Sequence, residues 1–400
     1  MKLPVLFILI TVTLDAMGIG LILPIMPDLI QEVQGGSLAN AALWGGVLAT
    51  AFSVMQFTFG PMMGSLSDRY GRRPVLLISL FFMALDYLVM ALAGSIWLLL
   101  GARIVGGITA ATHGTASAYM ADISSREEKA ANFGLIGAGF GVGFVLGPVI
   151  GGLLGEMGTR APFYAAAALS ALNFLFGYFV LKETVTDQTR RDFTWRRANP
   201  FGAFKSLSAL PGIRPLVIVF FVYSVALYVY PAIWAYFSQA RFGWGTQMIG
   251  VSLAVYGISS AAVQAGLIRV MLRKVGERRT VIYGFTFEIV ACLALAIVSK
   301  GLIALILTPI AALGAVISPA LQGIMSSTVG DDAQGELQGL LTSTYALAAI
   351  VSPLMMTSAF AAFTAESASY NLPGAPFVLA AVLLVGSLWL FLRVQAPSAT

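Results

Sequence analysis

Long apolar stretches alternate with short polar loops along almost the whole chain. A helix needs about 20 consecutive apolar residues to cross the hydrocarbon of a bilayer. Stretches of that size recur at 4–27, 41–65, 75–94, 97–120, 130–154, 161–181, 213–237, 247–271, 280–299, 302–323, 336–361 and 375–393. Because they show no short alternating pattern of barrel strands, these stretches predict an all-α membrane protein with twelve transmembrane helices.

The composition agrees with a protein that lies mostly in lipid. Apolar residues make up 58% and charged residues 10% of the 400 residues, and a soluble protein of this length needs more polar surface. The single cysteine, Cys292, lies in an apolar stretch, so no disulfide framework is expected. The first apolar stretch contains Asp15 and has no small-residue cleavage site, so we interpret it as a span and not as a signal peptide.

The net charge of +5 is concentrated in alternate loops. If both termini are cytoplasmic, the cytoplasmic loops hold every Lys and Arg except Arg160, Arg241, Lys300 and the intramembrane Arg103. This asymmetry follows the positive-inside rule and predicts that both termini are cytoplasmic. Because the basic residues lie in short loops between spans, nucleic acid is not an expected partner.

The longest interior connection, residues 185–210, is polar and basic and divides the chain into halves 1–184 and 211–400 with six spans each. A degenerate repeat supports this division: Gly71-Arg72-Arg73-Pro74 follows the second span and Gly276-Glu277-Arg278-Arg279 follows the eighth. Two six-helix halves related by internal repetition are typical of secondary transporters, which bind their substrate between the halves.

The loop between the second and third spans carries the most specific motif, Gly64-Ser-Leu-Ser-Asp68-Arg69-Tyr-Gly71-Arg72-Arg73-Pro74. This loop resembles the signature of the major facilitator superfamily. Together with Leu14-Asp15-Ala-Met-Gly18-Ile-Gly20-Leu-Ile-Leu-Pro24 in the first span, it is similar to the twelve-span drug:proton antiporters, especially the tetracycline efflux pumps. The likeness covers nearly the full chain, and further matches are Leu85-Asp86-Tyr87, Arg103, Asp122, Phe242-Gly243-Trp244 and Leu321-Gln322-Gly323.

The resemblance implies a role for this loop in the transport cycle. Residues that match Asp68 and Arg72 latch the two halves in the outward-open state, and Arg72 is expected near Asp122. The implied conformational latch comprises Gly64, Asp68, Gly71, Arg72, Arg73 and Asp122.

The fifth span contains glycines at every fourth position. A spacing of four places them on one helix face, where another backbone can approach closely. The stretch resembles the motif of antiporters as opposed to symporters, and packing alone is the other interpretation. The residues concerned are Gly139, Gly143, Gly147, Pro148, Gly151 and Gly152.

Four charged residues, Asp15, Asp86, Arg103 and Glu288, lie well inside predicted spans, where each costs about 2.5–3.5 kcal/mol on insertion scales. Asp86 and Arg103 lie at matching depths in the hairpin of spans three and four, which predicts an ion pair. That pair either takes part in proton movement or is structural. Asp15 and Glu288 have no basic partner at their depth, so they are the better candidates for proton exchange.

The only histidine, His113, is either a proton relay or substrate contact, or a satisfied buried imidazole. Two positions depart from the tetracycline pumps. Glu288 stands where those pumps carry an aspartate, and Ser260 stands where the best-known members carry a histidine. These departures bear on the substrate more than on the antiport mechanism.

Aromatic residues recur on one face of the seventh span, where Pro231 is expected to kink the helix. Such a face suits a planar drug, and lipid contact is the other interpretation. Polar side chains inside other spans are further cavity candidates. The predicted substrate-binding residues are Gln56, Tyr230, Trp234, Phe237, Ser260, Gln264 and Gln322.

The sequence has no Walker A loop, metal-ligand cluster or nucleophile motif, so neither an enzyme nor a cofactor is expected. We therefore predict a monomeric transporter of the bacterial inner membrane that exports an amphipathic drug such as tetracycline in exchange for protons. If the cargo is a tetracycline, a divalent cation bound to it is also expected. The alternatives are proton-linked transport of a native metabolite, such as a siderophore or sugar-like compound, and a non-transporting membrane receptor.

Overall fold

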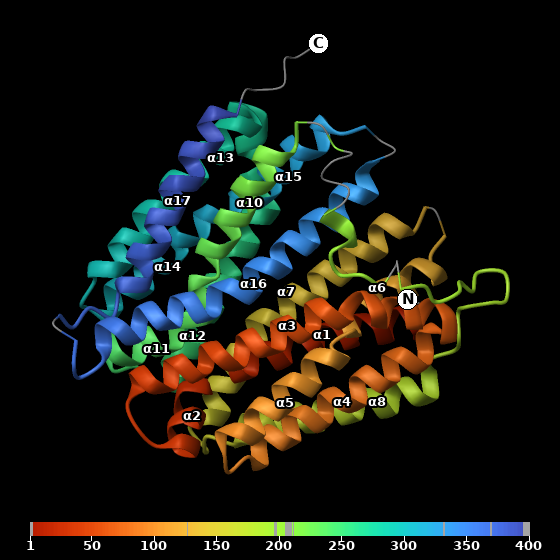
Figure 1. Ribbon diagram of the computed structural model, residues 1–400, viewed down its shortest axis with the longest axis horizontal. Helices are drawn as coiled ribbons and strands as arrows, with labels where there is room; N and C mark the ends of the chain where they lie inside the picture. The colour runs from red at the N-terminus through yellow and green to blue at the C-terminus, as the bar shows by residue number, and fades with distance from the viewer. Residues whose placement is uncertain are drawn as a thin grey trace. The chain divides into compact units, whose positions relative to one another are not determined.

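The computed structural model describes residues 3–125, 127–195, 198–204, 210, 212–330, 333–368 and 370–394. These residues form helices and no strands, and eleven of the helices are long and apolar enough to cross a membrane (Figure 1). The predicted all-α membrane fold is thereby confirmed. Five basic residues used in the charge argument lie outside the described residues: Lys2, Arg126, Arg196, Arg197 and Lys205.

The eleven helices account for twelve predicted spans because one of them contains two. The helical segment Thr246–Ile297 has 52 residues, which would measure about 78 Å at 1.5 Å per residue, against roughly 30 Å of hydrocarbon. The helical path is interrupted at Gly276, whose φ of 77° and ψ of 169° are not helical. Glycine adopts a positive φ without steric cost, so the chain can turn there.

One compact unit comprises Met1–Gly35, Ala51–Pro200 and Gly245–Ala254. In it α1 packs along α7, α4 packs against both α5 and α8, and α1 also contacts α6. Buried apolar side chains of these helices form its interior, with Phe7 and Leu76 fully covered. Its helices are α1 (Leu3–Ile22), α2 (Met26–Gln34), α3 (Leu38–Tyr70), α4 (Arg72–Leu92), α5 (Ile96–Thr109), α6 (Thr112–Ile123), α7 (Lys129–Gly155) and α8 (Ala161–Val180).

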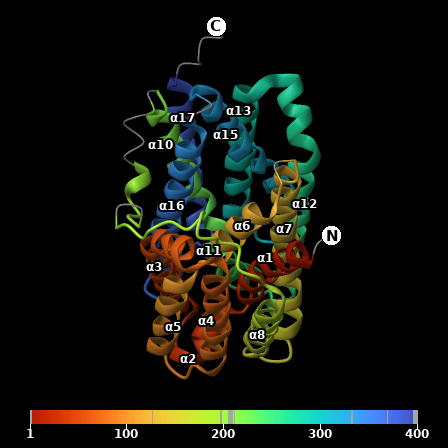
Figure 2. The same cartoon turned by 90° about the vertical axis from the view of Figure 1, so that its right-hand side faces the viewer.

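The second compact unit comprises Gly36–Thr50, Phe201–Trp244 and Val255–Thr400. Helix α17 packs against both α10 and α13, and α16 packs against α10 and α11 (Figure 2). Its helices are α10 (Arg214–Leu227), α11 (Val229–Phe242), α12 (Thr246–Ala262), η1 (Val263–Leu267), α13 (Ile268–Ile297), α14 (Gly301–Ala311), η2 (Ala312–Val316), α15 (Ile317–Thr328), α16 (Gln334–Thr364) and α17 (Ala375–Arg393).

Each unit includes a short segment from the other half of the sequence. The first part of α3 belongs to the second unit, where the Thr50 hydroxyl donates to the Ile350 carbonyl at 3.1 Å. The first part of α12 belongs to the first unit, where the Thr246 hydroxyl donates to the Gly152 carbonyl at 3.2 Å. The boundaries at 184 and 211 stay a prediction.

Several spans are irregular near their middle. The seventh span is divided where α10 ends at Leu227 and α11 begins at Val229, because Pro231 has no N–H to donate to the Leu227 carbonyl. The predicted kink at Pro231 is confirmed. The sequence did not predict the break between α5 and α6, the π-helical turn η1 or the 3₁₀ turn η2.

Candidate functional site

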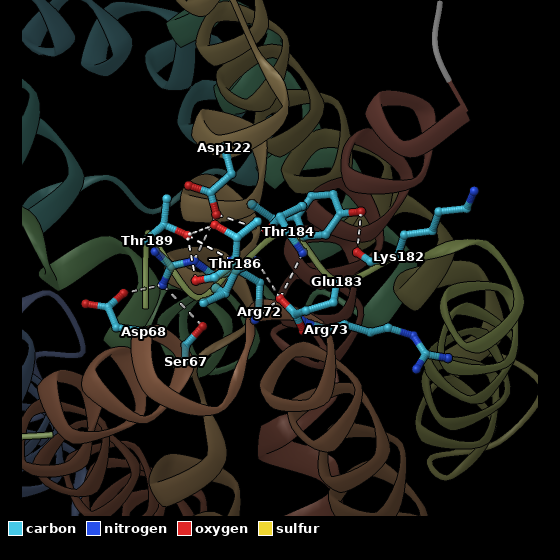
Figure 3. A network of polar contacts seen from close by, with 12 residues as sticks. Ser67, Asp68, Arg72, Arg73, Asp122, Lys182, Glu183, Thr184, Thr186 and Thr189 are labelled. Carbon is cyan, nitrogen blue, oxygen red and sulfur yellow. Dashed lines mark hydrogen bonds and ion pairs between the residues drawn. The ribbon is translucent and has the colours of Figure 1, made fainter. Parts of the chain in front are cut away.

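Polar side chains converge on the turn between α3 and α4, which contains the signature motif (Figure 3). Gly71 makes this turn with a φ of 115°. The Arg72 guanidinium donates to Asp68 Oδ1 at 2.5 Å, to Asp122 Oδ2 at 3.2 Å and to Ser67 Oγ at 3.3 Å. The expected proximity of Arg72 to Asp122 is therefore confirmed, whereas the latch function stays a prediction.

Two residues that follow α8 complete this cluster and were not predicted from the sequence. The Glu183 carboxylate accepts hydrogen bonds from the backbone N–H groups of Arg72 at 2.9 Å and Arg73 at 3.2 Å. The Thr184 hydroxyl donates to Asp122 Oδ2 at 3.0 Å. An acidic residue directly after the sixth span was the one signal that the sequence offered.

The turn at Gly276 in the second half has the same kind of backbone geometry as the turn at Gly71, but the residue that follows it carries the opposite charge. Gly276 has a positive φ like Gly71, and Arg278 donates to the Val394 carbonyl at 2.8 Å and to the Leu392 carbonyl at 3.2 Å. In the first half, Arg73 donates in the same way to the Tyr178 carbonyl at 2.8 Å. Both arginines therefore cap the last helix of their own half.

Glu277 occupies the first position after the turn, where the first half has Arg72. Its carboxylate lies beside Gly323 of α15. The two repeats thus carry opposite charges at equivalent positions.

Asp86 of α4 and Arg103 of α5 form the predicted ion pair. Their side chains are 6% and 11% exposed, and the guanidinium also lies over the Phe52 ring, 5.2 Å from its centroid. Gly106 lies directly against the Asp86 carboxylate, so a larger residue there would displace the acid. The pair is confirmed, and its part in proton movement is untested.

Asp15 is half-buried in α1. Among the described residues it has no ion pair and no hydrogen bond, although the Tyr87 hydroxyl lies against Gly18, one helical turn further on. On the neighbouring turn the Thr11 hydroxyl and the Asn173 amide are hydrogen-bonded at 3.2 Å. The expected lack of a basic partner for Asp15 therefore holds in the described part of the chain.

Glu288 lies on α13 with 1% of its surface exposed. Its carboxylate accepts from the Cys292 thiol at 4.0 Å and packs against Gly314 in the 3₁₀ turn η2. The Tyr230 hydroxyl lies 4.0 Å from the same thiol. The Tyr230 ring is stacked on Tyr256, with 5.5 Å between centroids. No cation among the described residues pairs with Glu288, so it is an embedded acid held by uncharged groups.

His113 is exposed at the start of α6, with its ring edge-on to Phe140 at 5.9 Å between centroids. It has no hydrogen bond within the described residues. The interpretation of His113 as a satisfied buried imidazole is therefore wrong. Phe140 is in turn stacked on Phe144 of the same helix, with 6.3 Å between centroids.

The aromatic face of the seventh span is covered by protein. Phe377 of α17 contacts three of its rings: the centroids lie 5.9 Å from Tyr230, 6.3 Å from Trp234 and 4.9 Å from Phe237. Trp234 is 5% exposed and Phe237 fully buried, so the interpretation as lipid contact is wrong. A substrate contact for these residues stays a prediction.

The glutamines among the predicted substrate-binding residues lie on apolar helices. Gln56 and Gln264 are exposed on apolar helices, where lipid offers their amides no hydrogen bonds. The Gln264 amide donates to Ser260 Oγ at 3.2 Å, and the Gln322 amide donates to Ser318 Oγ at 3.0 Å. Gln264 lies in the π-helical turn η1, and such turns are frequent at functional sites. Water on these surfaces suits the amides better than lipid does.

The glycines of α7 bring two backbones into contact, as the spacing predicted. A side chain at Gly143 would meet the backbone of Thr13 and Met17, and one at Gly147 would meet the backbone of Met17 and Gly20. Gly139 and Gly151 lie on the same face of α7, against Leu9 and Leu21. This face packs on α1, the helix that carries Asp15.

A second face of α7 packs on the first part of α12, within the same compact unit. Gly152 lies against the backbone of Thr246, and Gly250 lies against the Pro148 carbonyl. The antiporter-like motif thus contacts two helices, one from each half of the sequence. Its role in alternation stays a prediction.

Twelve apolar spans in two related halves, with ionisable groups embedded in both, define a polytopic membrane transporter and not an enzyme. The sequence profile of the Major Facilitator Superfamily matches residues 8–353. The chain belongs to the Major Facilitator Superfamily.

Curated relatives and solved structures agree with this assignment. The chain is 41% identical over 356 residues to the tetracycline resistance protein, class C, of Escherichia coli, covering 89% of both chains. It is 37% identical over 392 residues to the class G protein of Vibrio anguillarum, covering 98% of this chain and 97% of that one. A bacterial homologue of the human lysosomal transporter Spinster shares the fold with a TM-score of 0.80 at 17% identity, covering 99% of this chain and 98% of that one.

Proposed function

We propose that this chain exports a tetracycline-type drug across the bacterial inner membrane in exchange for protons. The names of the relatives support the cargo class. The observation that carries the coupling is the pair of embedded acids, Asp15 and Glu288, neither of which is neutralised by a described cation. An ionised carboxylate is costly in such surroundings and a neutral one is not, so each acid favours proton binding before the protein changes conformation.

The glutamine amides and the embedded acids have separate tasks in this mechanism. Gln56, Gln264 and Gln322 provide hydrogen bonds to the polar edge of the drug, and the drug's rings supply apolar area. Protonation of Asp15 or Glu288 changes the relative stability of the two end states of alternating access. The proton gradient drives export because protons bind more tightly in one state than in the other.

The α3–α4 cluster stabilises one of these end states in the proposed cycle. Arg72 holds Asp68 and Asp122 together, and any rearrangement that separates them must break two charge-assisted hydrogen bonds. Both termini lie on the cytoplasmic side in this proposal, and a single chain suffices for transport.

The test is drug transport in inverted vesicles with a fluorescent pH readout. Acidified vesicles should take up tetracycline with Mg²⁺ and release protons from the lumen as they do so. Asp15→Asn and Glu288→Gln should each abolish the proton release, whereas Glu127→Gln, on an exposed loop, should leave it unchanged. Because a tetracycline would be carried with its divalent cation, EDTA should lower uptake.

Proton release in both acid variants at the parental rate would refute the coupling. No response to any tetracycline would refute the cargo and leave a proton-linked metabolite transporter. Ser260 and Glu288, which depart from the tetracycline-pump pattern, favour that second candidate. A siderophore or a sugar-like compound that elicits proton release in the same vesicles would establish it.

A further inference from the structure

Two helices of the first unit cap each other at the end that carries the α3–α4 turn (Figure 3). Glu183, three residues beyond the end of α8, accepts from the first backbone N–H groups of α4. Arg73, in the first turn of α4, donates to the Tyr178 carbonyl near the end of α8 and lies over the Tyr178 ring at 5.5 Å. Free N–H groups at a helix start and free carbonyls at a helix end thus find charged partners on the neighbouring helix.

The Glu183 carboxylate is saturated with donors. Besides the N–H groups of α4, its Oε1 accepts from the backbone N–H groups of Thr184 and Val185, both at 2.9 Å. Glu183 is exposed, so burial does not fix the position of its side chain. The four backbone N–H groups that donate to its carboxylate fix that position.

This carboxylate fixes the residue on which the latch depends. Arg72 uses its backbone N–H to bind Glu183 and its side chain to bind Asp68 and Asp122. Thr184 binds the same Asp122 oxygen as Arg72 does. Residues 183 and 184 therefore hold both the start of α4 and the end of α6.

We propose that Glu183 is a positioning residue of the Arg72 latch: it acts through the backbone of α4 to hold the Arg72 side chain between Asp68 and Asp122. This inference rests on the proposed function, because the latch matters only in a cycle of two end states. It also assigns a task to the start of the connection between the halves. That segment is joined to the latch through Glu183, and again through the Arg191 N–H, which donates to the Asp68 carbonyl at 3.3 Å.

The second half provides an internal comparison. Arg278 caps the end of α17 as Arg73 caps the end of α8. The position equivalent to Arg72 is Glu277, which cannot bridge two carboxylates. The arginine cap thus occurs in both halves, whereas the described residues show a carboxylate cap with a bridging arginine only in the first half.

The experiment compares Glu183→Gln, Arg72→Ala and the double variant in inverted vesicles at matched protein amounts. Glu183→Gln should lower the transport rate about tenfold, because it removes the charge from hydrogen bonds that are strong through that charge. In the Arg72→Ala background the same substitution should cause no further loss, since two residues that act through one another are non-additive. Glu336→Gln is the matched control, an exposed acid in the first turn of α16.

A second measurement needs no substrate. Hydrogen exchange of the detergent-purified protein should be faster in Glu183→Gln at Arg72 and Arg73 and also at the end of α6 around Asp122, and unchanged in Glu336→Gln. Parental transport in Glu183→Gln, additive losses in the double variant, or unchanged exchange near Asp122 would each overturn the proposal. If the vesicles transport no tetracycline, the proposed cargo fails, and the exchange data still decide whether Glu183 positions Arg72.

Discussion

Replacing Asp86 by Asn should destabilise the protein strongly, because it leaves Arg103 charged and buried without its partner. The two side chains are 6% and 11% exposed, and breaking a buried pair by removing one partner costs about 3–5 kcal/mol. That energy corresponds to roughly a few hundred- to a few thousand-fold change in the folding equilibrium. Stacking of Arg103 over Phe52 does not replace the lost carboxylate.

A double replacement separates stability from function. Asp86→Leu with Arg103→Met removes both charges, and apolar substitution of a buried pair is often neutral or stabilising by about 1–4 kcal/mol. We expect the melting temperature of the purified protein to fall in Asp86→Asn and to recover in the double variant. We also predict that the pair takes part in proton movement, and in that case the double variant should lack drug uptake in inverted vesicles because hydrocarbon cannot carry a proton.

Two outcomes would refute this reasoning. If Asp86→Asn melts at the parental temperature, burial of the pair is not energetically significant. If the double variant both folds and transports as the parent does, the pair is structural and proton movement follows another route.

Three further predictions use matched pairs of positions. Gly147→Ala should lower the melting temperature by an amount equivalent to about 1–3 kcal/mol, because the added methyl group overpacks against Met17 and Gly20. Gly141→Ala on the same helix has open space beside it and should leave the melting temperature unchanged. Equal melting curves for the two variants would contradict the close contact. Gly314→Ala should impair transport, because its methyl group would displace the Glu288 carboxylate. Gly339→Ala meets no neighbour and should transport normally. Parental uptake in both variants would show that the position of Glu288 is unimportant. Arg73→Lys and Arg278→Lys should each lower thermal stability, because each loses hydrogen bonds to helix-end carbonyls. Such charge-assisted bonds contribute about 1.5–3 kcal/mol. Arg279→Lys is the control, and equal stability in all three variants would argue against the paired caps.

The sequence was sufficient to predict the features that depend on local composition. Spans follow from apolar stretches, and the Asp86–Arg103 pair follows from nearly equal distances along the chain to a hairpin turn. The close approach of another backbone to α7 follows from glycines spaced four residues apart, since side chains four apart share a helix face, whereas the identity of that partner, α1, does not. Each of these inferences needs only the geometry of a single helix or hairpin.

Features that depend on distant partners were not predictable. Glu183 binds backbone N–H groups 110 and 111 residues away along the chain, and backbone donors leave no mark in a sequence. The aromatic face of α11 was correctly placed on one side of its helix, but its partner Phe377 could not be inferred. The turns η1 and η2 contain Gly266 and Gly314, but glycine occurs throughout these spans and does not by itself indicate where a helix changes its hydrogen-bond pattern.

The non-helical backbone angles at Gly276 bear on the number of times that the chain is predicted to cross the membrane. Each crossing moves the chain to the opposite compartment, so an even number of crossings returns it and an odd number does not. With the interruption inside Thr246–Ile297, that segment can supply two of the twelve predicted crossings; as one unbroken helix it would supply only one and make the total odd. The predicted even number of crossings therefore depends on this one glycine, and so does the predicted compartment of every loop after residue 276.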